Sequence, residues 1–227
     1  MKKERVRQAE FGFVNRGGKR RGAGRKPKGE VPLVSHAKRE RLASRFPLHV
    51  TLKLEKGLPS LRQTSPYRIV KGALSVATDR FGCRVVHYSV QSNHLHLIVE
   101  AEDNRSLARG MNGLAVRIAR TLNRLWSRVG RVFADRFHAH VLETPREVKN
   151  ALRYVLRNTE KHGVTYIGGP DPFTSGESFD GWRNSPNAAD SHATLFGRAR
   201  TWLLRVGWRR HGLLGWLDLP PRRAVAR

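Results

Sequence analysis

The order in which strand-like and helix-like hydrophobic patterns follow one another constrains this chain more than any other feature. Alternating apolar residues predict strands at 48–54, 83–91, 93–101 and 131–143, and helical spacing predicts helices at 66–80, 106–129 and 145–162. The order β-α-β-β-α-β-α is typical of the ferredoxin-like split βαβ arrangement with one added helix. We therefore predict an α+β domain with helices on one face of an antiparallel sheet and the other face free to bind a partner.

The composition changes on both sides of this region. Residues 1–45 are rich in charge and glycine and poor in apolar residues, so we expect a disordered basic arm. The pattern then predicts a folded, catalytic domain at 46–163 and a Gly-, Pro-, Ser- and Asp-rich linker or loop at 164–194. A Trp- and Arg-rich appendage follows at 195–227, and we expect its tryptophans to pack on the domain while its arginines reach nucleic acid.

The charge of the chain points to a polyanionic partner. There are 44 Lys and Arg residues against 18 Asp and Glu residues, which gives a formal net charge of +26. Such an excess argues against an ordinary enzyme with a small neutral substrate and favours DNA or RNA as the partner. A structural protein of the ribosomal kind would have the same charge signature, so composition alone does not separate these classes.

Two other classes are disfavoured. A single cysteine, Cys83, excludes a disulfide framework within the chain and a cysteine-based zinc finger, and we expect it to be a small buried residue. No apolar run reaches the roughly 18 residues that a membrane span needs, and the basic N-terminus lacks a following apolar segment of the signal-peptide kind. We therefore expect a soluble intracellular protein without a membrane partner.

A pair of histidines lies on the central predicted strand. His94 and His96 are two residues apart, so their side chains project to the same side of the strand, and we expect His49 and Lys53 to point there too. Two imidazoles side by side form half of a binding site for a divalent metal ion. The pair His138 and His140 has the same spacing on a later strand and is a competing candidate.

The last predicted helix carries a tyrosine and a carboxamide on one face. Tyr154 and Asn158 are four residues apart, which places them one helical turn from each other. With a metal bound, Asn158 could add a third ligand and Tyr154 could attack a phosphodiester, although a phenol ionises only near pH 10 in water and needs a nearby cation. Each feature alone is more often structural; their joint occurrence in so basic a chain favours metal-assisted attack on DNA.

These two motifs resemble those of a known family. The run Ser92–Glu100 contains His-Leu-His, which is similar to the HUH motif of the single-tyrosine HUH transposases, and in particular of the REP-associated tyrosine transposases. The run Tyr154-Val-Leu-Arg-Asn158 is similar to the tyrosine helix of that subgroup, and the long helix and following hairpin up to Phe137 are similar too. The resemblance covers roughly residues 46–163.

The resemblance implies a ferredoxin-like fold, Mg²⁺ or Mn²⁺ as cofactor, and cleavage of single-stranded DNA at hairpin-associated sites through a 5′-phosphotyrosine. It makes His94, His96 and Asn158 the metal ligands and Tyr154 the nucleophile. The family often has proline after that asparagine, whereas Thr159 follows here, so we expect the helix to continue for another turn.

The expected partner is single-stranded or hairpin DNA, and the expected location is the bacterial cytoplasm, at the nucleoid. The predicted nucleic-acid-binding residues are Lys19, Arg20, Arg21, Arg25, Lys26, Lys53, Arg153 and Arg157. The run from Gly24 to Pro27 is similar to an AT-hook, although a solvated tail is the simpler interpretation. The sequence leaves open whether two chains form a homodimer, and a non-catalytic nucleic-acid-binding protein on the same scaffold is the alternative function.

Overall fold

The computed structural model describes residues 40–77, 79–158, 169–183 and 197–215, which all fall within one compact unit. The basic residues predicted to bind DNA between Lys19 and Lys26 lie outside the described residues. Within the described ranges, no helix combines the length and apolarity that crossing a membrane would require.

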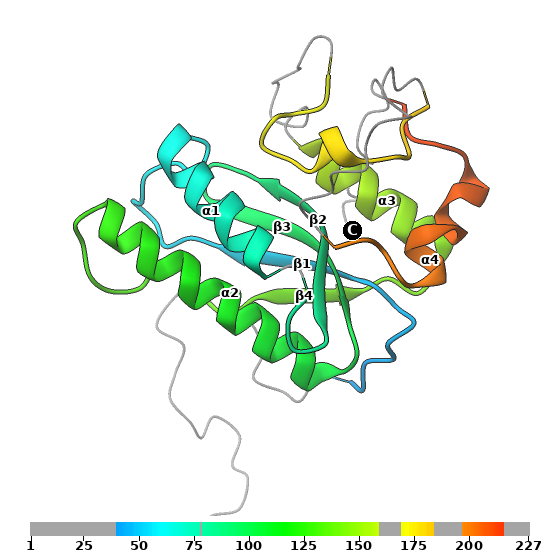
Figure 1. The fold of residues 1–227 in the computed structure, drawn as a ribbon, viewed down its shortest axis with the longest axis horizontal. Coiled ribbons are helices and arrows are strands. Elements are labelled where there is room, and N and C mark those ends of the chain that lie inside the picture. Colours follow the sequence, from blue (N-terminus) through cyan, green and yellow to red (C-terminus); the bar gives the residue numbers. More distant parts are fainter. Residues whose placement is uncertain (1–39, 78, 159–168, 184–196, 216–227) are drawn as a thin grey trace, which may run out of the picture. The chain divides into compact units, whose positions relative to one another are not determined.

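The centre of the fold is a four-stranded antiparallel sheet (Figure 1). Its strands are β1 (Leu48–Lys53), β2 (Cys83–Val90), β3 (His94–Ala101) and β4 (His138–Val141), in the spatial order β2-β3-β1-β4. Because β1 and β3 are the two inner strands, side chains of β3 lie beside those of β1 across the whole register. The predicted α+β class with a split βαβ topology is confirmed.

Two helices cover one face of the sheet. Helix α1 (Thr64–Val76) and helix α2 (Asn104–Leu125) contact each other, and α2 also contacts β2 and β3. The apolar stripe of α2 packs with the inward-facing residues of all four strands into the larger hydrophobic core. Helix α2 begins two residues before the predicted start at residue 106, because the Asp103 carboxylate caps it, accepting from the Ser106 backbone N–H at 2.7 Å.

The second face of the sheet is partly covered as well, so it is not the fully free binding face that was predicted. Helix α3 (Pro145–Leu156) and the C-terminal elements α4 (Trp202–Arg205) and η3 (Gly207–His211) form a smaller core there. This core includes Ile98 from β3 and Val86 from β2. Apolar side chains on both faces of β3 are the physical reason, since a strand buried on both sides needs two covering layers.

Helix α3 has strong local signals at its start and ends earlier than expected. Thr144 and Glu147 form a capping box, and Pro145 is the first helical residue. The backbone of Arg157 has left the helical region, with φ −126° and ψ 24°, so the α-helix ends at Leu156. The predicted continuation of the α-helix through Arg157 and Asn158 is therefore wrong. Residues 159–162 lie outside the described ranges.

The C-terminal segment 197–215 is built into the domain. A buried carboxylate, Glu100 of β3, accepts the backbone N–H groups of Arg200 and Thr201 at 2.8–2.9 Å and pairs with the Arg84 guanidinium at 2.9 Å. The Trp208 indole is buried within the α3 core, as predicted for the tryptophans, whereas Trp202 is about half exposed. Trp216 lies outside the described residues.

The described part of the predicted linker, residues 169–183, is an irregular but packed segment along the outer edge of β2. Asp171 accepts both ends of the Arg62 guanidinium at 2.9 Å, and Val90 donates its backbone N–H to the Phe173 carbonyl. Covering an edge strand in this way satisfies its backbone groups.

Candidate active site

The sheet face beneath α3 carries a cluster of histidines. Residues that pair across antiparallel strands point to the same face, and the register pairs His49 with His140, Thr51 with both His96 and His138, and Lys53 with His94. Both His-x-His pairs therefore lie on this one face, which the sequence alone could not establish. The shared side chains are His49, Thr51, Lys53, His94, His96, His138 and His140.

Helix α3 brings the predicted nucleophile to two of these histidines. The ring of Tyr154 meets His96 edge-on with a centroid separation of 5.0 Å, and it meets His49 at 5.6 Å. The predicted pairing of a strand histidine with the helix tyrosine is thus present in the fold. His138 and His140 are exposed on the edge strand β4.

Hydrogen bonds fix the orientation of the two histidines of β3. His96 is 5% exposed, and its Nδ1 lies 3.1 Å from His49 Nε2 and 3.2 Å from Thr51 Oγ1. His94 Nδ1 lies 2.7 Å from Asn93 Oδ1, and the two rings are 4.6 Å apart. A ligating imidazole usually donates its second ring N–H to such a partner, so Nε2 is the nitrogen of each ring that can coordinate an ion.

The side chain of Asn158 is buried, and its polar atoms are unsatisfied. It is 1% exposed, and neither its Oδ1 nor its Nδ2 has a hydrogen-bond partner among the described residues. Leaving a buried amide unsatisfied is costly, and a bound cation would satisfy the carbonyl oxygen. This observation fits the predicted metal-ligand role.

The donor set is nonetheless sparse. Within the described ranges, no three His, Cys, Asp or Glu side chains gather into a metal-binding group. His94, His96 and the carbonyl of Asn158 would therefore supply only part of a coordination shell, and the remaining ligands would be phosphate oxygens and water.

The comparisons with known proteins agree with this geometry. Residues 61–158 match the model of a family described as "Transposase IS200 like", and the matched range contains His94, His96, Tyr154 and Asn158. This part of the chain is therefore similar in sequence to the IS200-like transposases. No curated protein is significantly similar in sequence to the chain.

A solved structure shares the fold. It is described as a REP-associated tyrosine transposase bound to a REP hairpin, and it matches with a TM-score of 0.51 at 14% sequence identity. The match covers 74% of this chain and 93% of that chain, so it extends well beyond the segment of the family match. The predicted family resemblance is confirmed, and the predicted fold with it.

The predicted DNA-binding side chains of the folded domain differ in their surroundings. Lys53 is exposed on the histidine face. Arg153 is partly buried and donates to the side chain of Asn150 at 3.3 Å. Arg157 is 5% exposed and its Nη1 donates to the Gly215 carbonyl at 3.0 Å inside the protein, a position that does not favour the predicted contact with DNA.

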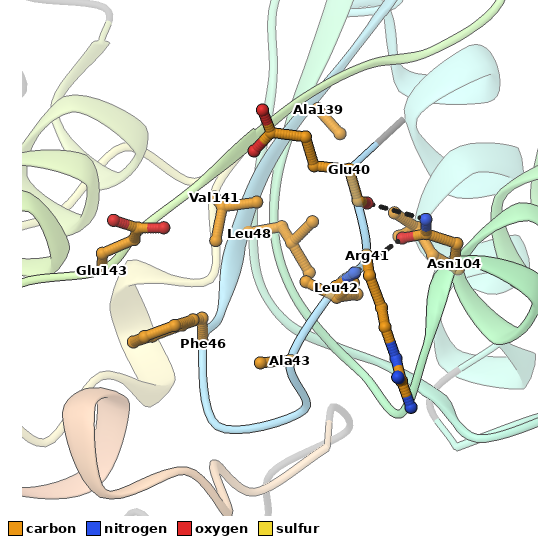
Figure 2. A pocket seen from close by; sticks show the side chains of 11 residues that line it. Glu40, Arg41, Leu42, Ala43, Phe46, Leu48, Asn104, Ala139, Val141 and Glu143 are labelled. Carbon is orange, nitrogen blue, oxygen red and sulfur yellow. Dashed lines mark hydrogen bonds between the residues drawn. The ribbon is translucent and has the colours of Figure 1, made fainter. Parts of the chain in front are cut away.

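A pocket of about 290 Å³ lies away from the histidine face (Figure 2). It follows β4 on the side of α2, where Ala139 and Val141 point. The Asn104 side chain closes one end by binding the Leu42 backbone N–H and the Glu40 carbonyl. No histidine, tyrosine or cysteine lines it, so the pocket is separate from the cluster of histidines and Tyr154.

Proposed function

We propose that this chain is a single-tyrosine transposase of the REP-associated kind, which cleaves and rejoins single-stranded DNA. The observation that carries this proposal is the contact of the Tyr154 ring with His96 in one chain, 5.0 Å between centroids. A phenol in contact with two histidines, on a helix that is followed by a buried carboxamide, in a chain of charge +26, suits attack on a phosphodiester.

In the proposed reaction, the Tyr154 phenol oxygen attacks the scissile phosphorus. The P–O3′ bond breaks, a 5′-phosphotyrosine forms, and the leaving 3′-oxygen takes up a proton as the phenol loses one. A second 3′-hydroxyl can reverse the exchange, so strands are rejoined without an external energy source. When bound by His94, His96 and Asn158, Mg²⁺ or Mn²⁺ supplies charge neutralisation at the phosphate oxygens.

The proposed substrate is DNA with a hairpin. The structurally similar transposase was solved with a REP hairpin, and the charge of this chain suits a phosphate backbone. Lys53 on the histidine face and Arg153 on α3 are proposed to hold phosphates near the cleaved bond. A chromosomal substrate would place the protein at the nucleoid of the bacterial cytoplasm.

The test is covalent capture of DNA. Purified full-length protein is incubated with 5′- and 3′-labelled hairpin oligonucleotides that carry single-stranded flanks, with Mg²⁺ or Mn²⁺. We expect an SDS-stable adduct with the label that lies 3′ of the cut, absent with EDTA and in Tyr154→Phe. Tyr67→Phe is the matched control, because Tyr67 lies on α1, on the opposite side of the sheet, and its adduct should persist.

Two outcomes would change the proposal. Tight binding with no adduct, across several hairpins and both metals, would replace it with the alternative of a DNA-binding protein on a transposase scaffold. An adduct that persists in Tyr154→Phe would retain the chemistry and reject Tyr154 as its nucleophile.

A further inference from the structure

A tight turn between α1 and β2 holds an aromatic residue in an unfavourable backbone conformation. Arg80 and Cys83 exchange backbone hydrogen bonds of 3.0 and 2.9 Å, so Phe81 and Gly82 are the two central residues of a hairpin turn. Their φ angles are +58° and +69°, the signature of a type I′ turn. That turn favours Asn-Gly, because an L-residue with a bulky side chain is strained at positive φ.

Packing does not compensate for this strain in the usual way. The Phe81 side chain is 50% exposed and belongs to neither hydrophobic core. Its ring instead carries two guanidinium groups, that of Arg109 from α2 at 4.7 Å from the centroid and that of Arg80 at 5.4 Å. A function of the exposed ring explains this strained conformation better than a contribution to stability does.

The charges around the ring suit a nucleic acid. Arg80 and Arg109 border the ring and are exposed, and Arg105 is exposed in the first turn of α2. Of the neighbouring acids, Asp103 is engaged as the cap of α2, and Asp79 pairs with Arg84 and Arg200. Glu102 is exposed beside Gly82, so the surface is positive but not uniformly so. An exposed ring bordered by guanidinium groups is the arrangement that stacks an unpaired base and pairs the adjoining phosphates.

The turn lies far from the catalytic residues. Cys83, which follows it, pairs with Ala101 at one end of β3, whereas His94 begins the other end. Seven residues of strand separate the two ends, roughly 23 Å. A DNA strand bound at both places would therefore contact the turn with nucleotides remote from the cleaved bond.

We propose that the Phe81 turn is a second DNA-binding site, at which an unpaired base stacks on the Phe81 ring and Arg80 or Arg109 binds a phosphate. A base that stacks on the ring takes the place of one guanidinium group, which then faces the backbone of the same strand. The base belongs either to a hairpin loop or to a single-stranded flank. This proposal rests on DNA being the substrate, as argued above.

The test uses Phe81→Asn in the full-length protein, since asparagine suits the turn and cannot stack like phenylalanine. Fluorescence anisotropy is measured with three labelled DNAs, namely a looped hairpin without flanks, a hairpin with a flank, and a blunt duplex without a loop. We expect the variant to melt at a higher temperature and to bind the unpaired DNA about 5- to 100-fold more weakly. Duplex affinity should not change, and Phe81→Trp should keep the affinity of the original chain.

The results separate the failure of this proposal from that of the proposed function. Weaker binding of the looped hairpin by Phe81→Asn supports the site and assigns the stacked base to the loop. Weaker binding of the flanked hairpin, with unchanged binding of the looped hairpin, supports the site and assigns the base to the flank. Equal affinity of Phe81→Asn and the original chain for both unpaired DNAs would overturn the site while leaving the transposase chemistry intact. A lower melting temperature in Phe81→Asn would assign the ring a structural role and also overturn it. Absence of DNA binding by the original chain would instead reject the function.

Discussion

Single hydrogen bonds decide how the residues of this site can act. The His96 ring is held through Nδ1 by His49 Nε2 and Thr51 Oγ1. If His96 coordinates an ion through Nε2, its Nδ1 must carry the proton and donate it to these acceptors. His49 is then a positioning residue, which fixes the tautomer of a ligand without touching the ion.

The first residue-scale prediction concerns this partner. His49→Phe keeps an aromatic ring beside Tyr154 but removes the acceptor, so the Mn²⁺ concentration for half-maximal adduct formation should rise about 10- to 100-fold. Thr51→Val, which removes the second acceptor at constant shape, serves for comparison, and direct Mn²⁺ binding by electron paramagnetic resonance provides an independent readout. A fall in melting temperature with an unaltered metal requirement would mean that His49 only packs.

The second residue-scale prediction concerns pH. Burial lowers the pKa of His87 to about 4, with the Asp180 carboxylate opposing the effect, and the ring Nδ1 lies 3.2 Å from the Ser175 hydroxyl oxygen. The unfolded chain therefore takes up a proton at this histidine, near its ordinary pKa of about 6.5, before the folded chain does. Stability should fall as the pH drops from about 6.5 to about 4. His87→Gln should show a shallower loss in urea titrations over this window, and parallel curves would contradict the assignment.

At the scale of the elements, close approach of backbone sets the packing of α2 on the sheet. A β-carbon added at Gly110 would lie 2.6 Å from the Cβ and Sγ of Cys83, whereas nothing lies within 4 Å of one added at Gly113. Both glycines are in α2. The helix can contact β2 so closely only because Gly110 has no side chain.

The element-scale prediction compares these two positions. Gly110→Ala should lose about 1–2 kcal/mol, because overpacking against Cys83 outweighs the better helix propensity of alanine. Gly113→Ala should gain about 0.5–1 kcal/mol, since only the propensity term acts there. Urea unfolding of both variants measures the difference. Stabilisation by both changes would show that α2 has room to move away from β2.

The same scale shows what the sequence could and could not predict. Periodicity located all three long helices, and the spacings i, i+2 and i, i+4 identified the histidine pair and the tyrosine–asparagine pair. The predicted strand at 131–143 shortens to His138–Val141, because only these residues form a continuous ladder with β1. The apolar residues Val132 and Phe137 are buried outside the strand. Leu95, Leu97, Ile98 and Val99 place apolar groups on both faces of β3, which is the signal that both faces are covered.

Other features depended on contacts between distant segments. The bond between His49 and His96 needs the register of two strands, and the burial of Arg157 needs Gly215, which is 58 residues away. Neither contact leaves a local pattern, so the orientation of His96 and the internal role of Arg157 could not be read from spacing. The basic arm of residues 1–39 lies outside the described ranges, and its DNA-binding role stays a prediction.

At the scale of the whole molecule, the C-terminal segment and the tyrosine helix form one packed layer. Trp208, Leu203 and Leu204 share a core with Val148, Leu152 and Val155 of α3. Glu100 holds the start of the segment through the backbone of Arg200 and Thr201. The segment therefore holds α3 against the same chain's sheet, and Tyr154 against the same chain's His96.

The whole-molecule prediction is that one chain forms a complete site. A mixture of His96→Ala and Tyr154→Phe proteins should form no adduct, because an exchanged α3 would have to leave its core and expose Val148, Leu152 and Val155. Original chain mixed with an equal amount of Tyr154→Phe gives the reference, about half the adduct. Adduct in the double mixture, after incubation long enough for subunit exchange, would mean that two chains complete each other's sites. In that case Trp208→Ala, which loosens the layer around α3, should increase it.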